Sequence, residues 1–239
     1  MTLLDFEGDY GRTYNTRIGT LIPAYQASFE IAAATAAALQ PLAQQALVVG
    51  AGTGTELPAL LAAMPQARFT LVEPSAQMRG FCQALINRVG AADRVVWGPD
   101  DLAAIPREAN GGFDAVISHN VLHVLAPDAQ EQLLRQMADQ VAPGGCLLLS
   151  SYSETEPPDL ELGIAIGVAR FRALGMDPST IEAVMASRNT KVFSMDAERL
   201  ERQLTHAGLE PPIQLLQALF HRLWLSRRAP VQCEGDAIA

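Results

Sequence analysis

Short apolar runs and stretches of helical spacing alternate along the middle of the chain. The apolar runs have the length of strands, and they occupy 46–50, 68–73, 94–97, 113–118 and 146–151. Runs that are apolar throughout, each followed by a helix, are typical of parallel strands that need cover on both faces. The pattern therefore predicts a doubly wound α/β sheet with right-handed crossovers.

The last third of the chain follows a different pattern. A helix is predicted over 197–206, and two apolar runs, 213–218 and 220–226, follow it with a very short join. Two strands so closely joined must run antiparallel, which predicts a hairpin at one edge of the sheet.

The domain organisation predicted from these elements is a single α/β domain over 1–239. Two segments with helical character interrupt the alternation, about 1–39 and 154–189, and both are expected to form a helical cap over the carboxyl ends of the strands. The residues from 229 to 239 are expected to be a loose tail.

A glycine-rich turn, Gly50-Ala51-Gly52-Thr53-Gly54, lies between the first strand and the next helix. Glycines there permit a tight turn and a close approach of ligand to backbone, and helix N-terminal amides favour an anionic group. The spacing is GxGxG and not the GxGxxG of dinucleotide sites, so the third glycine comes one residue early for a nicotinamide dehydrogenase. A turn of this kind also occurs for purely structural reasons, and by itself it is a weak signal.

Acidic residues at the ends of the next two strands strengthen a ligand-binding interpretation. Glu73 follows the glycines by about twenty residues, where a carboxylate can accept both ribose hydroxyl hydrogens. Asp100 and Asp101 follow the third strand, where a carboxylate can accept from the amino group of adenine. The carboxyl ends of neighbouring parallel strands line one crevice, so the sequence predicts a nucleoside-type ligand there.

At this point the chain resembles the class I S-adenosylmethionine-dependent methyltransferases. The resemblance extends from about Tyr14 to Arg228, and its motifs are LVVGAGTGTE, LVEPSAQM, WGPDDL, FDAVISHNVLHVL and APGGCLLLSSY. It implies a Rossmann-like sheet of seven strands whose last strand is antiparallel, and it implies S-adenosyl-L-methionine as the cofactor.

The resemblance also implies roles for individual residues. The three glycines would face the methionine part of the cofactor, Glu73 the ribose, and Asp100 or Asp101 with Leu102 the adenine. Tyr25 lies in a Pro-x-Tyr sequence similar to one that contacts the cofactor in the tRNA uridine carboxymethyltransferases. The full set of expected cofactor-binding residues is Tyr25, Gly50, Ala51, Gly52, Thr53, Gly54, Glu73, Met78, Asp100, Asp101, Leu102 and His119. Val48 departs from the family, which usually has an acidic residue at that position to orient the amino-acid end of the cofactor.

Catalysis of methyl transfer depends mainly on alignment and a dry pocket, because the methyl donor is already activated. Tyr14, Asn120 and Tyr152 are the expected catalytic residues, since all three are predicted near the acceptor side. His123 is an alternative proton acceptor or a structural residue. Its spacing from His119 suits a metal, but no further ligand accompanies the pair, so no metal is predicted.

The cap is expected to determine the acceptor. Its apolar residues Phe171, Met176 and Met185 suit a small organic molecule or simply a packed helical core. Arg17 and Arg170 could hold a substrate carboxylate or be solvated helix charges.

Composition limits the partners. The formal net charge is −9, which disfavours nucleic acid because affinity for phosphates comes mainly from Lys and Arg. No run of apolar residues reaches the ~20 needed to span a bilayer, and the first residues do not form a signal peptide. Three widely separated cysteines suit a reducing compartment, so a cytoplasmic protein with a small-molecule substrate is predicted, and a homodimer stays open.

The sequence is compatible with three functions. The first is an S-adenosylmethionine-dependent methyltransferase that acts on a small organic molecule. The second is a cyclase or lyase of the same fold that releases methylthioadenosine, as in azetidine-2-carboxylate formation. The third is a non-catalytic subunit that only binds the cofactor.

Overall fold

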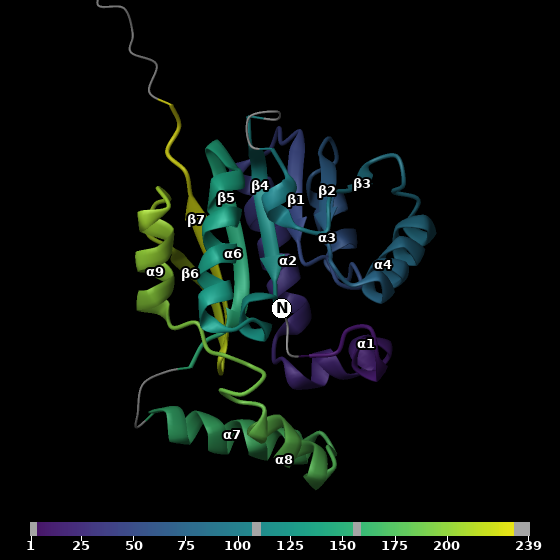
Figure 1. Cartoon of the computed structure of the whole chain (residues 1–239), viewed down its shortest axis with the longest axis vertical. Coiled ribbons are helices and arrows are strands. Elements are labelled where there is room, and N and C mark those ends of the chain that lie inside the picture. The colour runs from purple at the N-terminus through teal and green to yellow at the C-terminus, as the bar shows by residue number, and fades with distance from the viewer. Residues whose placement is uncertain (1–3, 107–110, 155–158, 232–239) are drawn as a thin grey trace, which may run out of the picture.

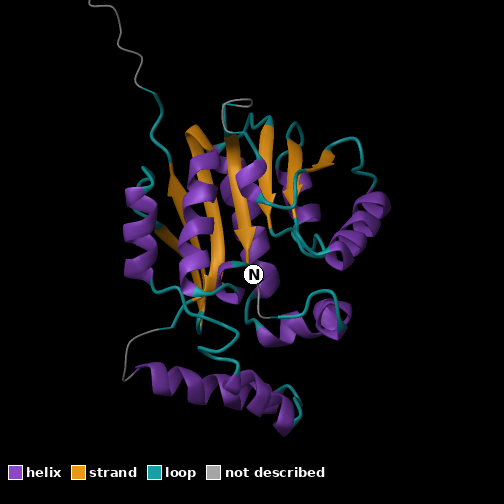
Figure 2. Ribbon diagram, viewed as in Figure 1, coloured by secondary structure: helices purple, strands orange, loops and turns teal. Residues whose placement is uncertain are grey.

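The computed structural model describes residues 4–106, 111–154 and 159–231. At its centre is a seven-stranded sheet with helices on both faces (Figure 1, Figure 2). The order across the sheet is β3-β2-β1-β4-β5-β7-β6. The strands are β1 (Gln45–Val49), β2 (Arg68–Val72), β3 (Val95–Trp97), β4 (Phe113–His119), β5 (Val141–Tyr152), β6 (Ile213–Ala218) and β7 (His221–Arg227).

Strand directions confirm the predicted Rossmann-like α/β fold. β1 is parallel to β2 and β4, and the parallel pairing continues to β3 on one side and to β5 on the other. β7 is antiparallel to both of its neighbours, β5 and β6. The strand order reverses between β1 and β4, and ligands of open α/β sheets bind at such a switch point, outside the carboxyl ends of the strands.

Side chains of successive residues in β1 enter opposite halves of the core, as the pleat requires. Ala46 and Val48 belong to the apolar cluster that includes residues of α2 (Tyr25–Leu39), α3 (Leu57–Ala63) and α4 (Ala76–Val89). Leu47 and Val49 belong to the cluster that includes residues of α6 (Pro127–Gln140) and α9 (Ala197–His206). Val48 is completely buried, so an apolar side chain suits a position where the family usually has an acid.

Three further helices lie beyond the carboxyl ends of the strands, α1 (Asp9–Leu21), α7 (Asp159–Ala173) and α8 (Pro178–Ala186). Of two short 3₁₀ helices, η1 (Leu102–Ala104) packs beside α6 on the face of the sheet, and η2 (Leu122–Val124) follows the end of β4. Figure 1 shows α7 and α8 as a separate layer at the lower end of the sheet, with α1 beside them.

The N-terminal segment divides between the two layers, which differs from the expected cap over 1–39. Only α1 lies at the end of the sheet, whereas α2 packs against its face. Ala32, Ala33 and Ala36 of α2 are buried in the same cluster as α3, because their small side chains allow the helix to approach the strands closely. The second cap segment, 154–189, contains α7 and α8, and its residues 155–158 lie outside the described residues, as does the tail from 232 onward.

β5 begins five residues earlier than its apolar run indicates. Val141 pairs with Phe113, and the register then shifts before Ala115 pairs with Cys146. Gly145 makes this irregularity possible, since a Cβ there would lie 2.9 Å from the carbonyl oxygens of Ala142 and Phe113.

Candidate cofactor and acceptor site

The glycine turn after β1 has the backbone conformation that only glycine adopts readily. Gly50, Gly52 and Gly54 have φ angles of +72°, +53° and +75°. A Cβ on Gly50 would lie 2.2 Å from Cγ2 of Val121, the residue that follows the end of β4 by two positions. The turn is therefore packed tightly against the segment that leaves β4, at the switch point of the sheet.

Glu73 connects this turn to the end of β2. Its Oε2 accepts a hydrogen bond from the amide of Gly52 at 2.8 Å, and its Oε1 accepts one from the amide of Ser75 at 2.9 Å. The side chain is buried, and burial raises the pKa of Glu73. Each carboxylate oxygen can accept further hydrogen bonds, so Glu73 is held in a fixed orientation with acceptor capacity left over.

The start of α4 and the N-terminal segment close one side of the turn. Ser75 caps α4 by accepting from the amide of Met78, and the buried Met78 reaches to 3.8 Å from a Cβ built on Gly52. Gln77 donates from Nε2 to the carbonyl of Phe6 at 2.8 Å. Thr53 donates to Oδ1 of Asn15 on α1 at 2.7 Å, so α1 is attached directly to the glycine turn.

The two predicted adenine acceptors have different local roles. Asp100 is exposed and forms an ion pair with Arg79, while Asp101 accepts from the amide of Ala103 and so caps η1. Leu102, the first residue of η1, is buried. Asp100 is thus the nearer of the two to α4, and Asp101 is used in a local turn.

The residues at the end of β4 carry unpaired polar atoms. Asn120 adopts a φ of +62°, which is uncommon outside glycine, and its buried Oδ1 has no hydrogen-bond partner among the described residues. His119 contacts Ser150 through Nδ1 at 2.8 Å, whereas its buried Nε2 is unpaired within the same part of the chain. Burial lowers the pKa of His119 to about 3. Backbone strain combined with unsatisfied buried groups is typical of functional sites.

Two tyrosines, Tyr14 of α1 and Tyr25 of α2, pack near the end of β4. The ring of Tyr25 packs on Phe29 with centroids 4.6 Å apart, and Phe29 packs on His119 at 4.8 Å. Burial raises the pKa of both tyrosines, and a hydrogen bond between them contributes to the shift of Tyr14. Both hydroxyls are therefore neutral at physiological pH and act as hydrogen-bonding groups only.

Glu56 is a feature that the sequence analysis did not single out. It is the last residue of LVVGAGTGTE, it is only 5% exposed, and burial raises its pKa to about 8. Tyr14 and Tyr25 interact electrostatically with it. The only hint in the sequence is its place at the end of the glycine motif, because burial of a carboxylate cannot be predicted from one acidic letter.

A cavity of about 380 Å³ lies beside these residues, between the strand ends and the helices α1, α7 and α8. Its size falls within the range of small-molecule sites. Its lining is mainly apolar and includes Ile18, Ile164, Phe171, Val184 and Phe220. Among the described residues, Tyr152 is the one expected catalytic or cofactor-binding residue that lines it, and the glycine turn, Tyr14 and Asn120 do not. The residues considered for the acceptor side that also line it are Arg17, His123, Arg170, Phe171 and Met185.

Two neutral histidines line the strand end of the cavity, His123 of η2 and His221 at the start of β7. Burial lowers their pKa values to about 3 and about 4, respectively. Nδ1 of His123 accepts from the amide of Tyr152 at 3.3 Å, so the proton of the neutral ring is on Nε2. His221 was missed by the sequence analysis, because nothing local distinguishes it from a core histidine.

Tyr152 forms a polar cluster at the cavity wall. Its hydroxyl donates to Glu154 and accepts from Nε of Arg188 at 3.2 Å, and Arg188 also forms an ion pair with Glu154 at 2.7 Å. Burial raises the pKa of Tyr152. Because its hydroxyl already has both of these partners, Tyr152 is fixed as part of the cavity wall and is not free to act as a base.

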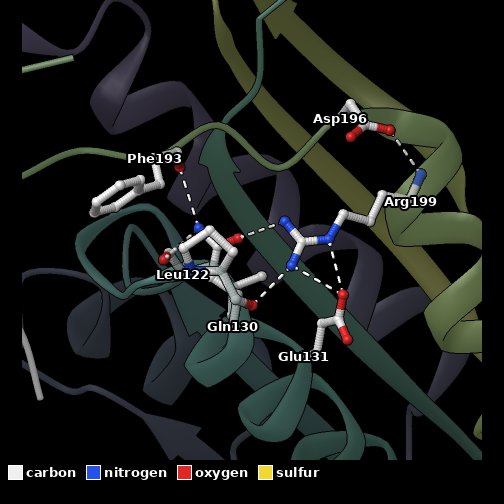
Figure 3. Close-up of polar contacts among 7 residues, drawn as sticks. Leu122, Gln130, Glu131, Phe193, Asp196 and Arg199 are labelled. Atoms are coloured by element: carbon white, nitrogen blue, oxygen red, sulfur yellow. Dashed lines mark hydrogen bonds and ion pairs between the residues drawn. The ribbon is translucent and has the colours of Figure 1, made fainter. Parts of the chain in front are cut away.

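A second polar network holds η2, and therefore His123, in place (Figure 3). Nε2 of Gln130 on α6 donates to the carbonyls of Leu122 at 3.0 Å and Phe193 at 3.2 Å. Arg199 of α9 donates to Oε1 of Gln130 at 3.2 Å and forms an ion pair with Glu131 at 3.0 Å. The amide of Phe193 in turn donates to the carbonyl of His123 at 2.8 Å.

Most of the expected site residues fall into three groups, whereas Asp101 and Leu102 lie apart from them at η1. Glu73, Met78 and the glycine turn are in contact, and Asp100 joins them only through Arg79. Tyr14, Tyr25, His119 and Asn120 form a second group around the end of β4. Tyr152 belongs to the cavity. Within the described residues, no cluster of three or more His, Cys, Asp or Glu side chains has the arrangement of a metal site, and no helix has the length and apolarity to cross a bilayer.

Fold and site together define a doubly wound α/β protein with a nucleoside-type site at its switch point. Comparisons with known proteins identify a methyltransferase domain within the chain. A methyltransferase-domain model matches residues 47–147. Ribosomal RNA small subunit methyltransferase G of Parasynechococcus marenigrum (strain WH8102) is 32% identical over 106 residues, which covers 38% of this chain and 43% of that protein.

Solved structures agree with this match. The mitomycin 7-O-methyltransferase MmcR is 25% identical with a TM-score of 0.60, over 85% of this chain and 54% of that one. Magnesium protoporphyrin IX methyltransferase from Synechocystis PCC 6803, with bound SAH, is 16% identical with a TM-score of 0.63, over 94% and 97% of the two chains. Residues 47–147 match a methyltransferase domain, and the neighbours support the fold of the class I S-adenosylmethionine-dependent methyltransferases for this chain. It spans less than half of the curated relative and about half of MmcR.

Proposed function

We propose that the protein transfers the methyl group of S-adenosylmethionine to an oxygen of a small organic molecule. The observation that carries this proposal is the position of Glu73, fixed to the glycine turn at the switch point. An apolar cavity lined by residues from the strand ends lies at the same end of the sheet. Structural neighbours that are O-methyltransferases support the choice of an oxygen acceptor.

The residues at the switch point suit this cofactor. Glu73 would accept from the ribose hydroxyls, and the tight positive-φ turn would allow backbone groups to approach the amino-acid end. The unpaired Oδ1 of Asn120 is an acceptor for a cationic group such as an ammonium. The buried Glu56 is a second acidic group near the turn, where Val48 provides none.

In the reaction, the acceptor oxygen attacks the methyl carbon, the carbon–sulfur bond breaks, and S-adenosylhomocysteine leaves as the acceptor loses its proton. The protein's contribution is alignment and exclusion of water by the apolar cavity wall. His123, whose Nδ1 accepts from the amide of Tyr152, would donate a hydrogen bond from Nε2 to the acceptor. His221, neutral at the same cavity, is the candidate group to receive the acceptor's proton.

Ribosomal RNA, the substrate named for the curated relative, is the less favoured acceptor. The match to that protein covers 38% of this chain and 43% of that protein. The net charge of −9 opposes contact with phosphates, and the cavity of about 380 Å³ has the size of a small-molecule site.

The proposal is tested by equilibrium binding of S-adenosylmethionine, followed by incubation with that cofactor and a metabolite extract. Formation of S-adenosylhomocysteine with a methylated compound supports transfer. Methylthioadenosine would instead identify a cyclase or lyase, and binding without consumption would identify a non-catalytic subunit. Absence of binding would overturn the cofactor assignment.

A further inference from the structure

The charges around the cavity differ from those of the chain as a whole. The chain has 17 Lys and Arg against 26 Asp and Glu. Among the described residues that line the cavity the balance is reversed, with four basic side chains and no carboxylate. The basic residues are Arg17, Arg170, Arg188 and Lys191.

Within the part of the chain that the structure describes, three of these four cations have no anionic partner. Arg188 is neutralised by Glu154 at 2.7 Å. Arg170 of α7 donates to the neutral carbonyl of Thr20 at 2.6 Å, and Arg17 of α1 lies 5.9 Å from the ring centroid of Tyr10. Within the described ranges, neither of these arginines nor Lys191 forms an ion pair. The cavity therefore carries uncompensated positive charge at its helical wall.

The opposite end of the cavity contributes no charge. His123 and His221 are neutral rings, and burial keeps their pKa values far below physiological pH. The cationic groups come from α1, from α7 and from the segment after α8, whereas the histidines come from the strand end. A ligand that spans the cavity would thus meet neutral donors and acceptors at one end and unpaired cations at the other.

We infer that the methyl acceptor is an apolar molecule bearing a carboxylate, which pairs with Arg170 and is further attracted by Lys191 and Arg17. The apolar wall, including Ile164, Phe171 and Phe220, covers the body of the molecule. A guanidinium is suited to the carboxylate, because its planar fork donates two parallel hydrogen bonds. This inference rests on the proposed function only in identifying the ligand as the acceptor; the charge preference of the cavity is independent of it.

The test measures ligand binding, not turnover. A panel of hydroxylated aryl and alkyl carboxylic acids, each paired with its methyl ester, is titrated into the protein in the presence of S-adenosylhomocysteine. We expect the acids to bind about tenfold or more tightly than their esters, as a charge-assisted hydrogen bond would provide. Equal or tighter binding of the esters, or no binding by any pair, would overturn the inference.

Variants locate the effect. Arg170→Met should remove most of the preference for acids while leaving ester binding unchanged. Arg172→Met is the matched control, because Arg172 is an exposed residue of the same helix that does not line the cavity. Lys191→Met, at an exposed position where folding is not at risk, should weaken acid binding about two- to fivefold, as expected of a solvated charge. An unchanged acid preference in both Arg170→Met and Lys191→Met would contradict the assignment.

The two proposals fail in different ways. If acids bind selectively but no S-adenosylhomocysteine forms from S-adenosylmethionine with any of them or with an extract, the methyltransferase proposal fails and the anion site stands. If methyl transfer occurs but only to neutral compounds, the methyltransferase proposal stands and the inference of a carboxylate-bearing acceptor fails.

Discussion

Glu73 and Gly52 are joined by a 2.8 Å hydrogen bond from the glycine amide to the carboxylate, which connects the ends of β1 and β2. The two residues are separated along the chain by a whole helix, so this contact forms only when the parallel pair is assembled. It fixes the carboxylate that is best placed to recognise a ribose, and it makes Glu73 important for both binding and stability.

Replacement of Glu73 by Ala should lower the affinity for S-adenosylmethionine about ten- to hundredfold, because hydrogen bonds to a charged group contribute ~1.5–3 kcal/mol. Isothermal titration calorimetry measures this directly. Glu161→Ala, on the exposed surface of α7, removes the same charge and should bind normally. Unaltered affinity in Glu73→Ala would remove the ribose assignment.

Gly50→Ala should destabilise the protein by ~2 kcal/mol or more, because the φ of +72° strains any other residue and the new Cβ would meet Val121. Urea denaturation gives the free energy of unfolding. Gly80→Ala is the control, since Gly80 lies in α4 and a Cβ added there would meet open space. Its free energy of unfolding should rise by ~0.5–1 kcal/mol. Val121→Ala should recover part of the loss in Gly50→Ala; additive losses would show that the clash is not the cause.

Glu56→Gln should stabilise the cofactor-free protein in a pH-dependent manner. The folded pKa of about 8 lies above the ordinary value of 4.5, so the folded state binds more protons than the unfolded state between these values. The wild type therefore loses stability as pH rises from 4.5 to 8, and the glutamine variant does not. In thermal melts, the melting temperature of Glu56→Gln should differ little from that of the wild type at pH 5 and should be clearly higher at pH 8.

Glu161→Gln, at an exposed position, serves as the control for the Glu56 variant and should show no such dependence. A gain in Glu56→Gln that is equal at both pH values would mean that Glu56 does not ionise differently in the folded and unfolded states.

Tyr152→Phe should raise the KM for the acceptor and change kcat by less than about threefold, because its hydroxyl is engaged by Glu154 and Arg188 and serves as a wall element. Steady-state kinetics with a substrate found in the extract distinguish the two parameters. A fall of kcat by two orders of magnitude with unchanged KM would instead assign Tyr152 to the chemistry.

Local signals in the sequence were sufficient for most of the architecture. The order of strands and helices follows from apolar runs and helical spacing, and the glycine turn follows from residues that must adopt positive φ. The placement of α2 on the sheet face was missed, because an Ala-rich helix buries equally well in a cap or against strands. The early start of β5 was also missed, because a bulge at Gly145 depends on the neighbouring strand.

The sequence by itself determined the α/β fold, the glycine turn and the acidic residue after β2, since each depends on neighbours along the chain or on a fixed strand order. Only the tertiary structure decided that Glu56 is buried, that His221 joins His123, and that Arg170 reaches the cavity with no anionic partner among the described residues. These properties arise from how α1, α7 and α8 pack over the strand ends. Burial and charge pairing are set by residues distant in sequence, and no local pattern encodes them.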